Sequence, residues 1–154
     1  MRNIKQTLSD IWGYTSFRVG QEDIINHLIQ KKSLLAVMPT GAGKSLCFQL
    51  PALLYENQTV VISPLVSLMD DQVNALKDID VKAERVHSDM PEEEKIHAWK
   101  EFKKGTIKIL YISPESLMKQ TVLSELKLLN ISMFVVDEAH CISKWGSNFR
   151  RDYE

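Results

Sequence analysis

Five short apolar runs, separated by longer stretches with helical spacing, constrain the fold of this chain more than any other feature. The runs cover residues 34–38, 59–63, 83–87, 107–112 and 131–136. Three of them are almost continuously apolar, which is typical of strands covered on both faces of a parallel sheet. Alternation of such strands with helices predicts βαβ units, and therefore an α/β fold with a parallel sheet.

The stretches between the runs show apolar residues at helical spacing, around residues 24–29, 65–76 and 96–102. The last of these helices is expected to begin with a capping box over residues 89–92 and to end at Gly105. Ser63-Pro64 and Ser113-Pro114 each join a strand to a helix. In both pairs we expect Ser to be the N-cap and Pro to be the first helical residue.

Composition limits the class of protein. The 154 residues are 44% hydrophobic and 25% charged, which fits one ordinary globular domain. The formal net charge is -1, so any nucleic-acid site must be a local arrangement. No run approaches the roughly 18 apolar residues of a membrane helix, and a membrane partner is not expected. Cys47 and Cys141 lack the spacing of zinc ligands, so we expect no zinc. We expect both to be reduced thiols in a cytosolic protein.

A glycine-rich segment follows the first apolar run and precedes a helical stretch. It reads Thr40-Gly41-Ala42-Gly43-Lys44-Ser45. Its glycines let successive backbone N–H groups face one anion, and the following helix adds its positive end. This context predicts a phosphate loop for ATP, although Met38 stands where the strict pattern has Gly. Lys44 is expected to reach the β- and γ-phosphates, and Ser45 to bind Mg²⁺.

Two carboxylates end the last apolar run, in Asp137-Glu138-Ala139-His140. Charges at the end of a buried strand need a partner, because an unpaired buried charge is costly. A Mg²⁺ ion would supply one, held by Asp137 directly or through water. Glu138 would then orient and deprotonate the attacking water.

Together these segments resemble the superfamily 2 helicases, and further motifs resemble the RecQ family of ATP-dependent DNA helicases. The resemblance implies a RecA-like P-loop NTPase domain, with His140 in the catalytic motif. Tyr14, Arg18 and Gln21 lie in a segment similar to the family's adenine-recognition motif. By this resemblance Gln21 would hydrogen-bond the adenine edge, and Tyr14 and Arg18 would pack on the base.

The residues after His140 resemble the aromatic-rich loop of the RecQ family, which couples single-stranded DNA to ATP hydrolysis. Trp145 and Phe149 could stack on bases and Arg150 could meet a phosphate. Lys144, Ser147, Asn148 and Arg151 depart from the usual residues of that loop. An earlier segment resembles the family's first DNA-contact motif, in which Ser63, Ser67 and Gln72 could touch backbone phosphates.

The resemblance also implies that residues 1–154 are a partial first RecA-like domain, incomplete at the C-terminus just after the aromatic-rich loop. In the family a further strand lies between the P-loop strand and the strand ending at Asp137. Without it, we expect the edge of the Asp137 strand to be exposed and the chain to be poorly stable. A second RecA-like domain supplies an arginine finger worth about 10³–10⁵ in rate. The isolated chain is therefore expected to hydrolyse ATP slowly and not to unwind DNA.

Three functions remain open from the sequence. The first is the motor domain of a 3′-to-5′ DNA helicase acting on single-stranded and duplex DNA in repair or recombination. The second is a non-catalytic fragment that binds nucleotide or DNA. The third is a DEAD-box-type RNA helicase, against which His140 and the aromatic-rich loop argue. The family implies a cytoplasmic, nucleoid-associated location in bacteria or a nuclear one in eukaryotes.

Overall fold

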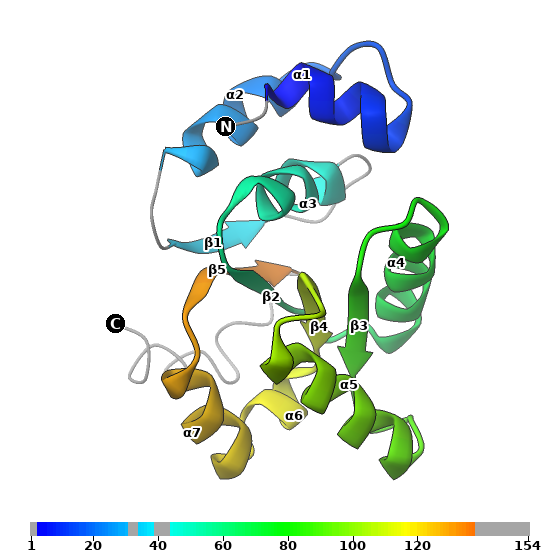
Figure 1. Ribbon diagram of the computed structural model, residues 1–154, viewed down its shortest axis with the longest axis vertical. Coiled ribbons are helices and arrows are strands. Elements are labelled where there is room, and N and C mark those ends of the chain that lie inside the picture. The colour runs from blue at the N-terminus through cyan, green and yellow to red at the C-terminus, as the bar shows by residue number, and fades with distance from the viewer. Residues whose placement is uncertain (1–2, 31–33, 39–43, 138–154) are drawn as a thin grey trace.

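The described part of the chain forms a five-stranded parallel sheet between two layers of helices (Figure 1). The computed structural model describes residues 3–30, 34–38 and 44–137. Its strands are β1 Leu34–Met38, β2 Gln58–Ile62, β3 Ala83–Val86, β4 Ile109–Ile112 and β5 Ile131–Asp137, in the order β1-β5-β2-β4-β3. Its helical segments are α1 Ile4–Thr7, η1 Leu8–Trp12, α2 Gln21–Ile29, α3 Lys44–Leu54, α4 Val66–Asp78, α5 Glu92–Lys104, α6 Pro114–Leu117 and α7 Gln120–Leu128. Every strand pair among these residues is parallel, which confirms the predicted fold class.

The pairing of β1 with β5 corrects one prediction. By the family resemblance a further strand would lie between them, and we expected β5 to have an open edge without it. Instead the two strands form a direct parallel ladder from Leu34↔Met133 to Met38↔Asp137, while β2 covers the other edge of β5. Backbone groups of a buried strand need ladder partners, and here the two strands satisfy each other. The predicted open edge on β5 is therefore wrong.

The alternation of side chains along the strands divides the core between the two faces of the sheet. One face carries Val61, Ile109, Tyr111, Met133 and Val135, which pack against α3 and α4. The other face carries Val60, Ile62, Leu110, Ile112 and Val136, which pack with residues of α5, α6 and α7. Burial on both faces explains why these strands are almost continuously apolar.

The N-terminal helices pack on the outer side of α3, away from the sheet (Figure 1). Leu8 of η1, Ile25 of α2, and Leu46 and Leu50 of α3 form a small separate core. This arrangement gives α3 apolar neighbours on two sides. No helix among the described residues is both long and apolar enough to cross a membrane.

Several element boundaries differ from those predicted. The structure confirms the bounds of β1, whereas β2 starts and ends one residue earlier than expected and β4 starts two residues later. β3 ends at Val86 instead of residue 87, and β5 continues to Asp137. Apolar side chains also fill the loops next to a strand, for example Ile107, so hydrophobicity alone does not mark the ends of the ladder.

The helix caps follow the prediction at two positions and depart from it at two others. Ser113 caps α6 by accepting a hydrogen bond from the Ser116 N–H, with Pro114 as the first helical residue. Gly105 ends α5 in the left-handed conformation at φ 89°, where side chains are strained. The capping box over residues 89–92 is wrong, because α5 starts after Pro91 with no side-chain cap. Helix α4 likewise begins at Val66 and not at Pro64.

Candidate nucleotide and nucleic-acid site

The carboxyl ends of the strands meet at one edge of the sheet and carry the predicted motifs. Met38, which precedes the glycine-rich segment, is the register partner of Asp137. On the next strand Ile62 is level with both Val136 and Ile112, so the loops that follow β2 and β4 leave from the same edge. In open parallel sheets ligands bind beyond this edge. The ends of the strands that precede the predicted phosphate loop, acidic motif and first DNA-contact segment therefore lie at one edge of the sheet.

Helix α3 begins at Lys44, directly after the glycine-rich segment. Its first turn contains no acidic residue. The first N–H groups of a helix lack helical acceptors and carry a partial positive charge, so an anion is stabilised there. Ser45 is half-buried in this turn. The start of α3 therefore has the local electrostatics that a bound phosphate needs.

Part of the predicted site lies outside the described residues. This part comprises Thr40, Gly41, Ala42 and Gly43 of the phosphate loop, Glu138 and His140 of the acidic motif, and Trp145, Phe149 and Arg150 of the aromatic-rich loop. For Lys44 and Asp137 the structure gives the place of the backbone. Their roles stay predictions.

The residues expected to recognise adenine lie around the start of α2. Tyr14 and Arg18 are exposed, whereas only 7% of Gln21 is. The Gln21 side-chain oxygen accepts a hydrogen bond of 2.7 Å from the Arg18 backbone N–H. Contact of both ends of this amide with an adenine edge would require that bond to be exchanged. The segment is thus a local polar cluster at a helix start, and adenine binding by it stays a prediction.

The three residues expected to touch DNA phosphates have different environments. Ser67 is exposed in the first turn of α4. Ser63 is only 2% exposed, and its hydroxyl accepts a hydrogen bond from the Leu65 N–H at 3.4 Å. Gln72 is half-buried, with its side-chain oxygen bonded to the Tyr111 hydroxyl. Of the three, Ser67 alone lies fully at the surface.

A polar cluster that sequence reasoning missed fixes α4 to β3. Asp70 of α4 accepts hydrogen bonds from Arg85 Nε at 2.9 Å and from His87 Nε2 at 3.1 Å. Burial opposes ionisation of Asp70, but these hydrogen bonds and the positive charge of Arg85 hold the pKa of its carboxyl below the usual value. The cluster therefore holds the helix that presents Ser67.

The residues at the sheet edge fit the proposed nucleotide and metal. Hydroxyl and carboxylate oxygens are the ligands that Mg²⁺ prefers, and Ser45 and Asp137 supply this pair of groups. The register Met38↔Asp137 brings the backbone of the acidic motif level with the strand that leads to α3. Among the described residues no three or more His, Cys, Asp or Glu side chains are grouped so that they could hold a metal ion.

The chain is similar to a known protein family and to several of its relatives. Residues 18–154 match the DEAD/DEAH box helicase family. The probable ATP-dependent DNA helicase RecS of Bacillus subtilis is 45% identical over 99% of this chain and 31% of its own length. The ATP-dependent DNA helicase RecQ of Pasteurella multocida is 43% identical over 97% of this chain and 24% of its own length.

A solved structure agrees on the fold. The DUF1998 helicase MrfA superposes with a TM-score of 0.69 over 97% of this chain and 26% of its own, at 24% sequence identity. This chain thus spans a third or less of the length of each of these three proteins. The family match, the ordered motifs and the parallel sheet lead to one assignment: the chain belongs to the DEAD/DEAH box helicase family and carries a helicase domain of the RecQ type.

Proposed function

We propose that this domain binds and hydrolyses ATP as part of the motor of a 3′-to-5′ DNA helicase. The observation that carries the proposal is the register of β1 against β5, in which Met38 pairs with Asp137. This pairing sets the end of β1, which leads into the proposed phosphate loop, level with the end of β5, nearly a hundred positions later in the sequence. Phosphoryl transfer requires the phosphate loop and the acidic motif to act on the same nucleotide.

The chain's own residues then have distinct tasks. Lys44 binds the β- and γ-phosphates, together with the backbone N–H groups that lead into α3. Glu138 orients the attacking water and takes its proton. Ser45 and Asp137 hold Mg²⁺, which neutralises charge on the phosphate oxygens when it is bound.

The DNA contacts in this proposal come from two segments. Ser67 can donate a hydrogen bond to a backbone phosphate from the exposed first turn of α4. Trp145 and Phe149 stack on unpaired bases, and Arg150 binds a phosphate. Because the net charge is -1, this binding depends on local geometry more than on a general attraction. Strand separation is proposed for a protein in which this domain works with a second RecA-like domain.

Binding of a fluorescent ATP analogue with Mg²⁺ tests the proposal. Lys44→Ala removes the cation that faces the phosphates, and we expect the affinity to fall by at least about ten-fold, as for the loss of a charged hydrogen-bonding partner. Lys100→Ala, which removes an exposed lysine from α5, is the matched control and should bind like the parent chain. Circular dichroism of each variant verifies that the fold is kept.

Two results would contradict the proposal. One is a folded parent chain that does not bind the analogue at all. The other is equal affinity for the analogue in Lys44→Ala and Lys100→Ala. Comparing oligothymidylate with oligouridylate as the added strand then separates a DNA motor from an RNA motor, and we expect the DNA strand to have the larger effect on nucleotide binding.

A further inference from the structure

Three polar side chains from three different elements form a chain of hydrogen bonds inside the core. Nε2 of Gln49 donates to the hydroxyl of Tyr111 at 2.8 Å. The same hydroxyl donates to Oε1 of Gln72 at 2.5 Å. Tyr111 is fully buried, and Gln49 is only 6% exposed. Polar groups at such depth are costly unless they are bonded, so this chain has a defined geometry.

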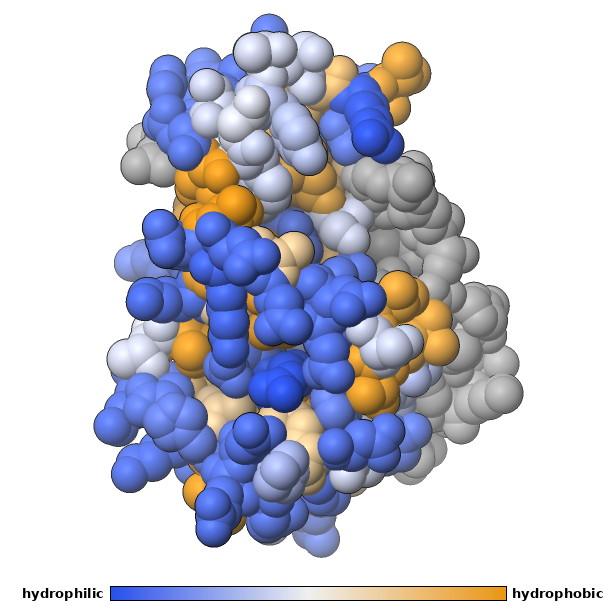
Figure 2. All heavy atoms as spheres, turned by 90° about the vertical axis from the view of Figure 1, so that its right-hand side faces the viewer, coloured by the Kyte–Doolittle hydropathy of each residue, from blue (hydrophilic) through white to orange (hydrophobic). Residues whose placement is uncertain are grey.

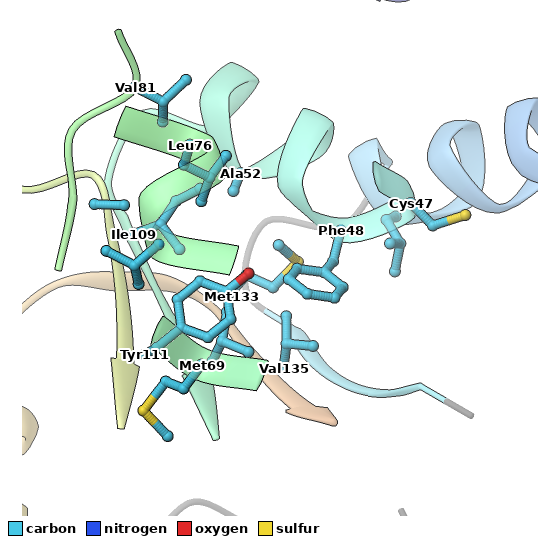
Figure 3. Packing of buried hydrophobic residues seen from close by; sticks show 14 residues of the cluster. Cys47, Phe48, Ala52, Met69, Leu76, Val81, Ile109, Tyr111, Met133 and Val135 are labelled. Carbon is cyan, nitrogen blue, oxygen red and sulfur yellow. The ribbon is translucent and has the colours of Figure 1, made fainter. Parts of the chain in front are cut away.

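This chain of hydrogen bonds crosses the layer between the sheet and the two helices that cover one face of the sheet. Gln49 lies on α3, Tyr111 on β4 and Gln72 on α4. The Tyr111 ring packs in the apolar cluster that α3 and α4 share with the sheet, with its centroid 6.5 Å from that of Phe48. Figure 3 shows the ring inside this cluster, with its oxygen on the side of Phe48.

The direction of each bond follows from the chemistry of the groups. A phenol has one proton to give, and here it goes to the oxygen of Gln72. The phenol oxygen then accepts from the amide of Gln49. One hydroxyl therefore serves both helices, and a shift of either helix by a fraction of a hydrogen-bond length weakens one of the two bonds.

The two end residues of this chain of hydrogen bonds lie on the helices of the two proposed binding surfaces. Gln49 lies one helical turn beyond Lys44 and Ser45, on the helix that starts at the phosphate loop. Gln72 lies on α4, one turn beyond the exposed Ser67. The bond to Tyr111 uses the oxygen of the Gln72 amide, and its nitrogen end is chemically suited to donate to a phosphate.

We propose that the chain Gln49–Tyr111–Gln72 couples nucleotide binding at the start of α3 to DNA binding on α4, with Tyr111 as a positioning residue. This inference rests on the proposed function, because it requires both ligands to bind. Binding of either ligand fixes its own helix, and the shared hydroxyl favours the matching position of the other. Coupling of this kind is reciprocal, so each ligand raises the affinity for the other by the same factor.

Tyr111→Phe tests the proposal, because it removes only the hydroxyl and keeps the buried ring. The measurement is the dissociation constant of a fluorescent, non-hydrolysable ATP analogue with Mg²⁺, with and without saturating oligothymidylate of about 16 nucleotides. In the parent chain we expect DNA to raise nucleotide affinity at least about five-fold. In Tyr111→Phe this factor should fall to near one, while the affinity for each ligand alone changes less than about two-fold.

A second variant and a control complete the experiment. Gln49→Met removes the hydrogen bond between α3 and Tyr111 and leaves Tyr111 bonded to Gln72. This variant should lose the coupling in the same way. If Tyr111→Phe does not fold, Gln49→Met alone tests whether the hydrogen bonds couple the two ligands. Thr59→Val removes another fully buried hydroxyl from the same sheet, one without a hydrogen-bond partner among the described residues, and should keep the parent's coupling factor.

The outcomes separate this inference from the proposed function. Loss of coupling in Tyr111→Phe and Gln49→Met, with both ligands still bound, supports the inference. Coupling that persists in both variants overturns it, as does a parent chain that binds both ligands independently. A folded parent chain that binds no nucleotide overturns the proposed function first, and the inference with it.

Discussion

Nε2 of His87 lies 3.1 Å from Oδ1 of Asp70, and this contact joins the end of β3 to α4. The other ring nitrogen of His87 accepts the Asp89 backbone N–H at 3.2 Å, so the ring proton is on Nε2 and is donated to Asp70. Arg85 donates to the same carboxylate oxygen. A single carboxylate on α4 therefore receives two donors from the β3 segment, one of them on a side chain only 3% exposed.

This arrangement makes the stability of the domain depend on pH through Asp70. Burial opposes the charged form, but hydrogen bonds from Arg85 and His87, together with the positive charge of Arg85, hold the pKa of Asp70 below its usual value. A carboxyl with a lowered folded pKa stabilises the protein above its unfolded pKa, and this stability is lost as the pH falls through the folded pKa. We expect Asp70→Asn to lower the free energy of unfolding by about 1 kcal/mol at neutral pH, since its partly exposed side chain is screened by solvent.

Urea unfolding of the two proteins at neutral pH and at a series of acidic pH values checks this expectation. The difference between them should shrink as the pH falls through the range where Asp70 becomes protonated. Asp71→Asn is the control, because it removes one charge from an exposed neighbour on the same helix and should change stability by less than about 0.5 kcal/mol. Equal losses in both variants would show that the contact with His87 and Arg85 has no special role.

Thr59 of β2 carries a buried hydroxyl that has no hydrogen-bond partner among the described residues. An unsatisfied buried hydroxyl costs about 1–3 kcal/mol, and valine has nearly the same shape without this cost. We therefore expect Thr59→Val to raise the free energy of unfolding by about 1 kcal/mol. Chemical unfolding in urea, with the slope of the transition unchanged, measures this gain.

Ser132 of β5 provides the opposite case. Its buried hydroxyl accepts a hydrogen bond of 3.0 Å from the Asn57 backbone N–H. Ser132→Ala leaves that N–H without its acceptor and should lower the free energy of unfolding by about 1 kcal/mol. If Thr59→Val loses as much stability as Ser132→Ala, the Thr59 hydroxyl is bonded in solution and the prediction is wrong.

The sequence predicted the strands well because a strand that is buried on both faces consists almost entirely of apolar residues. The run 34–38 is apolar without interruption, and no helix of ordinary length fits such a short segment between breaks. The order of the strands in the sheet has no such pattern in the sequence. Direct pairing of β1 with β5 depends on which backbones meet in space, and the apolar pattern of 34–38 is the same for either neighbour.

The buried polar contacts could not be predicted for the same reason. Tyr111 is 39 positions from Gln72 and 62 from Gln49, beyond the reach of any local pattern. One signal was present, since a tyrosine within the apolar run 107–112 needs a partner for its hydroxyl. It indicates that a partner exists but does not identify it. The helix starts at Val66 and Glu92 were missed because proline and serine form turns as readily as they cap helices.

Ser63 and Ser67 lie four positions apart, and their different exposure leads to a prediction for DNA binding. Ser67 is at the surface of α4, so Ser67→Ala removes a donor that can reach a phosphate. We expect this change to weaken binding of labelled oligothymidylate by roughly two- to ten-fold, as for one hydrogen bond, without altering nucleotide affinity. Fluorescence anisotropy at a fixed salt concentration measures it.

Ser63→Ala is the matched variant, because it deletes the same hydroxyl from a buried position in the turn after β2. It should lower the free energy of unfolding by about 1 kcal/mol and leave the DNA affinity of the folded protein unchanged. The reverse result, with Ser63→Ala weakening DNA binding and Ser67→Ala not, would mean that the turn after β2 opens when DNA binds. The exposed first turn of α4 would then not be the contact surface, and the phosphate would have to reach the buried serine directly.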